Sequence, residues 1–215
     1  VIRMDNRDVG LSQLFDHLYT PNLLWAGIKY KLGLPVRAPY SVADMAADAI
    51  GVLDALAIDQ AHIVGVSMGG MIAQRVAIAA PQKVLSLTSI MSSSGAKGLP
   101  QADSAVMRTL ISRPANSTPE AAVDHYVKLF KAIGSPSYPT PEDERRERIL
   151  LGVQRSFHPE GTLRQMLAIV SDITRAEQLA RITCPTLVLH GKSDPLVPYA
   201  HGEDTAQRIS GSRLL

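Results

Sequence analysis

The stretch AHIVGVSMGGMIAQ, residues 61–74, places Ser67 between two glycines at the end of an apolar run. Residues 61–66 have the composition of a short β-strand, and the small residues from about position 69 onward favour a helix. Residues 65–69 match G-x-S-x-G, in which the turn from strand to helix is so tight that both flanking positions are expected to be glycine. The sequence therefore predicts a turn that lifts the Ser67 hydroxyl clear of a sheet.

This position makes Ser67 a candidate nucleophile. The start of a helix carries the positive end of the helix dipole, and it would direct the backbone N–H of Met68 toward an oxyanion at an attacked carbonyl. The alternative is a packing turn, in which Gly69 and Gly70 only allow the helix to approach its neighbours. We predict Ser67 as the nucleophile and Met68 as an oxyanion donor.

A serine hydroxyl becomes a good nucleophile only when a base accepts its proton and an acid orients that base. The stretch LVLHGKSDPLVP, residues 187–198, places Asp194 in a loop after an apolar strand. That loop is expected at the carboxyl edge of the sheet, the same edge as Ser67. An Asp-Pro pair also forms ordinary turns, so a structural role is the alternative, and Asp172 is the next candidate acid.

Strand and helix patterns alternate along the chain, which predicts a mostly parallel sheet with covering helices. Strands are expected at residues 1–4, 61–66, 83–91 and 185–191. Ser41 and Asp44 have the spacing of a capping box before an amphipathic helix. A long region that follows carries only helical patterns, each beginning with a proline or a polar cap. We divide the chain into a core segment, an inserted helical cap and a second core segment: residues 1–94, 95–181 and 182–215.

The composition is typical of a packed globular protein that acts on a small molecule. Of 215 residues, 46% are hydrophobic and 20% are charged, and the net charge is only +2. No cluster of basic and aromatic residues predicts a nucleic-acid partner, and no apolar run is long enough for a membrane span. The mixed charges of residues 142–148 indicate a solvated helix face. Cys184 is expected to be buried and inert, and the histidines lack metal-ligand spacing, so we expect neither a metal nor a cofactor.

These segments together resemble the α/β-hydrolase fold. VIRMDNRDVGLS at residues 1–12 is similar to the family's fourth strand and the loop after it, GVSMGG to its nucleophile elbow, and HGKSDPLVP to its acid loop. Within this family, the sequence of these segments resembles most the branch of aclacinomycin methylesterase-like enzymes and bacterial carboxylesterases. The resemblance covers nearly the whole chain and implies a serine–acid–histidine triad under a helical cap, without a cofactor.

The resemblance also implies where the base lies. The family's histidine follows the acid after one more helix and one more strand, so we expect it beyond residue 215. His201 is expected on the exposed side of that helix, and His190 is expected to pack beneath the acid loop. The second oxyanion donor and the strand beside residues 61–66 are expected before Val1. We therefore expect a chain truncated at both ends, which alone would hydrolyse esters no faster than a Ser67→Ala control.

These features predict a serine hydrolase that cleaves carboxylic esters of small, mostly apolar substrates through an acyl-enzyme. The expected walls of the substrate pocket are Leu23, Leu24, Trp25, Met91 and Val197. The same residues could instead act on an amide, a lactone or a carbon–carbon bond, or in perhydrolysis. A non-catalytic binding protein with the same fold is the alternative from another class. The first residues lack a signal-peptide pattern, so we expect a cytoplasmic protein, whose oligomeric state stays open.

Overall fold

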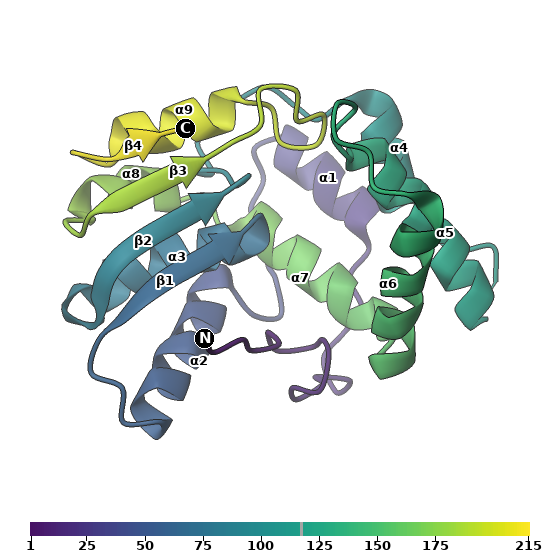
Figure 1. The fold of residues 1–215 in the computed structure, drawn as a ribbon, viewed down its shortest axis with the longest axis horizontal. Helices are drawn as coiled ribbons and strands as arrows, with labels where there is room; N and C mark the ends of the chain where they lie inside the picture. The colour runs from purple at the N-terminus through teal and green to yellow at the C-terminus, as the bar shows by residue number, and fades with distance from the viewer. Residues whose placement is uncertain (117) are drawn as a thin grey trace.

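The computed structural model describes residues 1–116 and 118–215, apart from the side chains of Tyr30 and Lys31. Its four strands form one parallel sheet in the order β1-β2-β3-β4 (Figure 1). The strands are β1 (Ala61–Val66), β2 (Val84–Ile90), β3 (Thr186–Leu189) and β4 (Arg213–Leu214). The α-helices are α1 (Leu23–Lys31), α2 (Val42–Ala55), α3 (Met68–Ala79), α4 (Ser104–Ile111), α5 (Pro119–Ile133), α6 (Glu142–Arg155), α7 (Pro159–Ser171), α8 (Arg175–Gln178) and α9 (Ala200–Arg208). Short 3₁₀ turns, η1 (Pro81–Lys83) and η2 (Leu179–Arg181), lead into β2 and the segment before β3.

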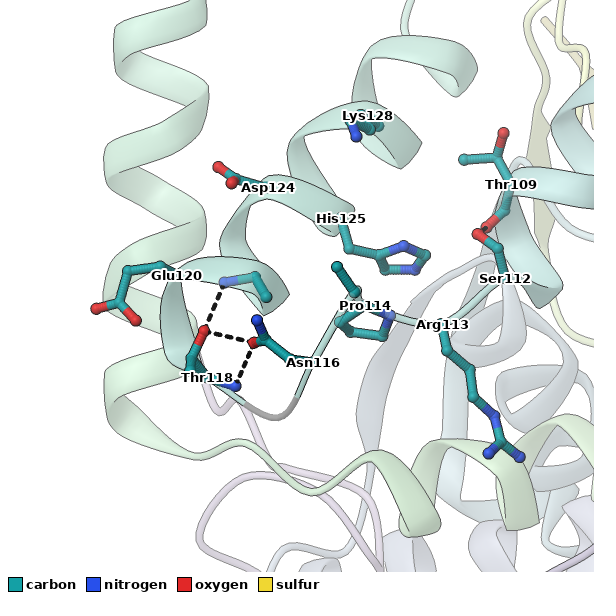
Figure 2. A pocket seen from close by; sticks show the side chains of 12 residues that line it. Thr109, Ser112, Arg113, Pro114, Asn116, Thr118, Glu120, Asp124, His125 and Lys128 are labelled. Carbon is teal, nitrogen blue, oxygen red and sulfur yellow. Dashed lines mark hydrogen bonds between the residues drawn. The ribbon is translucent and has the colours of Figure 1, made fainter.

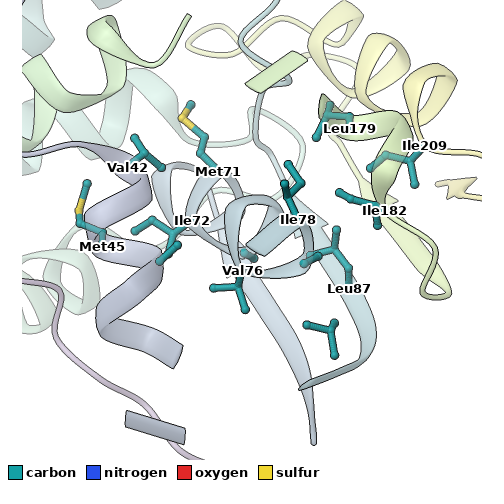
Figure 3. Close-up of a cluster of buried hydrophobic side chains, with 14 of the residues drawn as sticks. Val42, Met45, Met71, Ile72, Val76, Ile78, Leu87, Leu179, Ile182 and Ile209 are labelled. Atoms are coloured by element: carbon teal, nitrogen blue, oxygen red, sulfur yellow. The ribbon is translucent and has the colours of Figure 1, made fainter. Parts of the chain in front are cut away.

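The main core lies between one face of the sheet and helices α2 and α3. Figure 1 shows α3 behind the strands and α2 extending downward past β1, and α3 is buried along most of its length. The start of α2 is fixed by the expected capping box: the Ser41 hydroxyl accepts from the Asp44 N–H at 3.1 Å, and the Asp44 carboxylate accepts from the Ser41 N–H at 2.7 Å. The side chains labelled in Figure 3 are Val42, Met45, Met71, Ile72, Val76, Ile78, Leu87, Leu179, Ile182 and Ile209. Burial of this apolar surface anchors the turn between β1 and α3.

Strands β1, β2 and β3 end at the same level along the sheet. Val66 pairs with Ile90, and Ile90 pairs with Leu189, so the carboxyl ends of β1, β2 and β3 are in register. The ladder continues for one residue past each end, because the Ser67 N–H donates to the Ile90 carbonyl and the Met91 N–H donates to the Leu189 carbonyl, both at 2.8 Å. The loops that leave these three strands therefore start side by side.

The expected strand at residues 1–4 is absent, and that prediction was wrong. All four residues are exposed, and the segment that follows is held by side chains instead of by a backbone ladder. The Arg7 guanidinium binds the Asp48 carboxylate on α2 at 2.6 Å, and Asp8 binds a guanidinium of α7. The loop turns at Gly10, whose φ is +63° and where an added Cβ would lie 2.2 Å from Cγ of Asp5.

The region between β2 and β3 is helical throughout its secondary structure, as expected. Figure 1 shows α4, α5 and α6 at one end of the molecule, beyond the strands. Helix α5 begins with Thr118 as its cap and Pro119 in its first turn, whereas α6 buries none of its side chains. The charged stretch 142–148 thus lies on a solvated helix. The division of the chain into a core and a cap stays a prediction, and none of the helices in the described residues is long and apolar enough to cross a membrane.

Candidate active site

Ser67 occupies the turn between β1 and α3 with an unusual backbone conformation. Its φ is +53° and its ψ is −119°, a region that residues with a side chain rarely adopt and that costs of order 1–3 kcal/mol. Its carbonyl accepts from the Gly70 N–H at 2.9 Å and from the Ser92 hydroxyl at 2.7 Å. Within residues 1–116 and 118–215 the Ser67 hydroxyl forms no hydrogen bond, so it does not cap the helix that it precedes. The hydrogen bonds to the Ser67 carbonyl stabilise this strained backbone conformation, and the Ser67 hydroxyl has no hydrogen-bond partner among the described residues.

The glycines around Ser67 have different steric roles. A Cβ at Gly65 would lie 2.0 Å from the Gly69 carbonyl oxygen, and a Cβ at Gly70 would lie 2.6 Å from Cβ of Ser92. A Cβ at Gly69 would meet nothing within 4 Å. The expectation that both positions flanking Ser67 must be glycine is therefore wrong for Gly69, because its Cβ position points into open space. Close packing requires glycine at positions 65 and 70.

Met68 is the first residue of α3. The first N–H groups of a helix have no partner inside the helix, and the helix dipole places partial positive charge on them. No acidic side chain lies in the first turn of α3 to neutralise that charge. The Met68 N–H is consequently next to Ser67 and available to donate to an anion at this turn.

Asp194 lies in the loop after β3, with a side chain that is only 13% exposed. Its Oδ1 accepts from the N–H groups of Leu196 at 2.9 Å and Val197 at 2.8 Å, which fixes the carboxylate in an Asx turn. Its Oδ2 is 3.8 Å from Nε2 of His190, too far for a hydrogen bond. Nε2 of His190 instead donates to the Val197 carbonyl at 2.7 Å. His190 is buried beneath the acid loop, as predicted, and one oxygen of Asp194 remains available.

Asp172, the alternative acid, is engaged elsewhere. Its two carboxylate oxygens bind the guanidinium groups of Arg75 and Arg175, and the aspartate is buried. Burial is the main reason that the pKa of Arg175 is lowered to about 10; the nearby charge of Arg75 acts in the same direction, and Asp172 opposes both effects. Two cations already share the Asp172 carboxylate, so it lacks a free oxygen to orient a catalytic base.

The expected wall residues fall into two groups. Met91 directly follows β2 beside Ser67, with a φ of +40°, and Val197 contacts the Asp194 carboxylate through its N–H. Leu24 and Trp25 lie on α1, where the Trp25 side chain is 57% exposed and the Lys29 ammonium lies 5.9 Å from its ring centre. Leu23, on the same helix, is partly buried. Their role as pocket walls stays a prediction.

Two cavities occur away from Ser67 and Asp194. The larger, of about 550 Å³, lies between α4 and α5, where Asn116 Oδ1 accepts from the Thr118 N–H at 2.9 Å and from its hydroxyl at 2.7 Å (Figure 2). The smaller, of about 210 Å³, is lined by residues that include Ser93, Arg175 and His201. Over the described residues, no group of three or more His, Cys, Asp or Glu side chains is placed to hold a metal ion.

Two features were not predicted from the sequence. Asp8, with a φ of +72°, forms a buried ion pair with Arg164 of α7. The carbonyl of the preceding residue, Arg7, accepts a hydrogen bond from the Gln165 side-chain amide at 2.8 Å. His201 lies on α9 as expected but is partly buried, because it hydrogen-bonds to Ser93 at 2.7 Å and to the Pro100 carbonyl at 2.9 Å. Only the polar turn that contains Asp8 and Gly10 had a local signal, since the partners of Asp8 and His201 lie far away in sequence.

Comparison with known proteins agrees with this fold. The sequence profile of the α/β hydrolase fold family matches residues 17–215. The chain belongs to the α/β hydrolases. Among curated α/β hydrolases it is 28% identical to the rhodomycin D methylesterase DauP of Streptomyces sp. (strain C5), covering 100% of this chain and 72% of DauP. It is 27% identical to the rhodomycin D methylesterase DnrP of Streptomyces peucetius, again covering 100% of this chain and 72% of the relative.

Solved α/β hydrolases have the same fold. A hydrolase from Pseudomonas aeruginosa PA01 superposes with a TM-score of 0.62 at 26% identity, over 98% of this chain and 68% of that one. The esterase EaEST from Exiguobacterium antarcticum superposes with a TM-score of 0.67 at 24% identity, over 98% of this chain and 70% of that one. The predicted fold class and the resemblance to methylesterase-like enzymes are both confirmed.

Proposed function

We propose that this α/β hydrolase cleaves carboxylic esters through an acyl-enzyme formed on Ser67. The observation that carries the proposal is the strained Ser67 turn, whose hydroxyl is left without a hydrogen bond within the described residues, at a sheet edge shared with the acid loop. Backbone strain of this kind persists where the surrounding structure enforces it, and it is concentrated at functional sites. A packing turn would not require the serine itself to adopt a left-handed conformation.

Each proposed role follows from one position. Ser67 Oγ attacks the acyl carbon, and the Met68 N–H donates to the oxygen that becomes negatively charged. Asp194, with Oδ1 already fixed by the acid loop, offers Oδ2 to orient a histidine. Ser67 and the start of the acid loop are separated by one intervening strand, a gap that an imidazole with a hydrogen bond at each nitrogen would fill. We place that histidine beyond residue 215.

The proposed substrates are small, mostly apolar esters, with methyl esters as the first group to examine. Two relatives are named methylesterases, which supports this choice. Of the proposed wall residues, Met91 follows the strand end that pairs with Ser67, and Val197 is hydrogen-bonded to Asp194. Their apolar side chains would suit an uncharged acyl group. No metal or cofactor is required for the acyl transfer itself.

A fluorophosphonate probe tests the nucleophile directly. In the native protein the probe should label Ser67, identified by peptide mass mapping, and Ser67→Ala should abolish both this label and ester turnover. Gly69→Ala is a matched neighbour whose added methyl group meets nothing within 4 Å and which leaves the serine in place. Labelling of another serine with Ser67 untouched would overturn the proposal.

A substrate screen separates ester hydrolysis from the other possible reactions. We expect turnover of methyl esters and of p-nitrophenyl esters with short acyl chains, and slower turnover of the matching amides and lactones. Preferred cleavage of an amide, a lactone or a carbon–carbon bond would leave Ser67 as the proposed nucleophile but would overturn the proposal that the substrates are esters. Ligand binding without turnover of any of these, with Ser67 unlabelled, would identify a binding protein instead.

A further inference from the structure

The smaller cavity, of about 210 Å³, is an open pocket lined by the loop after β2, the end of α7 and the start of α9. It also touches Met71, one helical turn along α3 from Ser67. Its polar wall includes Ser93 and His201, which belong to neither the Ser67 turn nor the acid loop. The residues of this wall form a hydrogen-bond chain with a defined direction.

The direction follows from the Pro100 carbonyl. A carbonyl oxygen only accepts hydrogen bonds, so Nε2 of His201, 2.9 Å away, carries the proton. In the neutral imidazole Nδ1 then has a lone pair, and it accepts from the Ser93 hydroxyl at 2.7 Å. Ser93 thus donates its proton toward a base whose tautomer is fixed by its second hydrogen bond.

The backbone around Ser93 fixes the position of its hydroxyl group. The Gly95 N–H donates to the Ser93 hydroxyl oxygen at 3.0 Å, in a turn where Gly95 has a φ of +79°. The Ser93 carbonyl accepts from the guanidinium of Arg175 at 3.0 Å, and Arg175 is almost fully buried. The Gly95 N–H fixes the position of the Ser93 hydroxyl oxygen, and the buried cation holds this turn in place.

From this geometry we propose that Ser93 and His201 form a second nucleophilic site, which accepts small acyl groups. Ser93 Oγ attacks the carbonyl carbon of an activated ester while its proton passes to Nδ1 of His201. The tetrahedral intermediate collapses, the bond from the acyl carbon to the leaving oxygen breaks, and the proton passes from His201 to the leaving group. The products are an O-acyl serine and an alcohol or phenol, without an oxidant or a reductant. This site does not depend on Ser67.

The size of the cavity sets the substrate class. At about 30 Å³ for each water molecule in the liquid, a volume of about 210 Å³ equals about seven waters. Met71, Leu99 and Ile169 contribute apolar side chains to the lining, and its two charged residues, Asp172 and Arg175, are paired with each other, which favours an uncharged group. The site therefore suits acetyl or other short acyl groups.

The test uses p-nitrophenyl acetate with the Ser67→Ala protein, so that the proposed primary nucleophile is absent. We expect release of p-nitrophenolate stoichiometric with the protein and an acetyl group on the peptide that contains Ser93. Ser67→Ala/Ser93→Ala should lose the acetylation. In Ser67→Ala/His201→Gln the amide can still hydrogen-bond but cannot accept the proton, so acetylation should slow by about 10²–10⁴-fold.

Ser94 provides the matched control. Its hydroxyl donates to the Asp204 carboxylate, and the side chain is fully buried outside the cavity lining. Ser67→Ala/Ser94→Ala should acetylate at Ser93 at the unchanged rate, and circular dichroism should confirm that each variant is folded. Absence of the adduct in Ser67→Ala, or an unchanged rate in the folded His201→Gln variant, would overturn the proposal. If His201→Gln fails to fold, His201→Asn takes its place, and the Ser93→Ala comparison still decides whether Ser93 reacts. These outcomes concern Ser93 alone, and fluorophosphonate labelling of Ser67 is scored separately.

Discussion

The Asp8 carboxylate and the Arg164 guanidinium form a two-pronged ion pair, with Nε to Oδ2 at 2.6 Å and Nη2 to Oδ1 at 2.9 Å. Neither side chain is more than 1% exposed. The pair joins the loop before α1 to helix α7 across 156 residues of sequence. A buried pair of this geometry makes the loop and the helix dependent on each other, because neither charge has water as a substitute partner.

Arg164→Met tests this dependence. Loss of the guanidinium leaves a buried carboxylate without its cation, so we expect the free energy of unfolding to fall by about 3–5 kcal/mol, measured by urea denaturation followed by circular dichroism. Arg146→Met on the neighbouring helix α6 is the matched control, because its partner Asp124 and its own side chain are half exposed. The control should lose less than about 1 kcal/mol. Equal losses in the two variants would show that the buried pair contributes no more than a surface pair.

The same pair predicts a sensitivity to acid. Burial alone would raise the pKa of Asp8, but the hydrogen bonds from Arg164 and from the Phe15 N–H outweigh it and hold the pKa below its usual value. The unfolded chain therefore binds more protons than the folded chain as the pH falls below about 5, and stability is lost down through the folded pKa. Urea unfolding at a series of pH values should show this decline. Asp8→Asn should be less stable at neutral pH and should decline less steeply, whereas parallel pH curves would contradict the assignment to Asp8.

Gly65 and Gly69 predict opposite responses to the same substitution. In Gly65→Ala the new methyl group would meet the Gly69 carbonyl oxygen at 2.0 Å, so we expect a loss of about 1–3 kcal/mol or more in the free energy of unfolding. In Gly69→Ala the methyl group has open space inside a helix, and we expect no loss or a gain of up to about 1 kcal/mol. Thermal unfolding measures both variants. A larger loss for Gly69→Ala would reverse the steric assignment.

Asp194→Asn tests the proposed acid in the native protein. An amide would favour the wrong tautomer of the histidine, and we expect kcat for ester hydrolysis to fall by about four orders of magnitude, with little change in stability. Asp172→Asn should show the reverse: it removes a buried carboxylate shared by Arg75 and Arg175, so stability should fall while kcat of the folded fraction is kept. If Asp194→Asn keeps most of its activity and Asp172→Asn does not, the acid is Asp172.

The parts of the fold that sequence patterns predicted are those set by neighbouring residues. The run 61–66, the turn at Ser67 and the small residues of α3 are contiguous, so one periodic pattern places all three. The pairing of Asp8 with Arg164, and of Ser93 with His201, depends on how distant elements pack, and no local pattern carries that information. Residues 1–4 have a strand-like composition, yet they lie outside the sheet, since composition alone does not supply a pairing partner.

The position of Trp25 has a spectroscopic consequence. It is the only tryptophan in the chain, and on α1 its ring is in contact with water and within 5.9 Å of the Lys29 ammonium. Its fluorescence in the folded state therefore resembles that of indole in water, and global unfolding shifts the emission wavelength very little. A molecule that settles on α1 would remove water from the ring and move the emission to the blue. Intrinsic fluorescence in this protein is thus a local reporter of α1 and a poor reporter of the core.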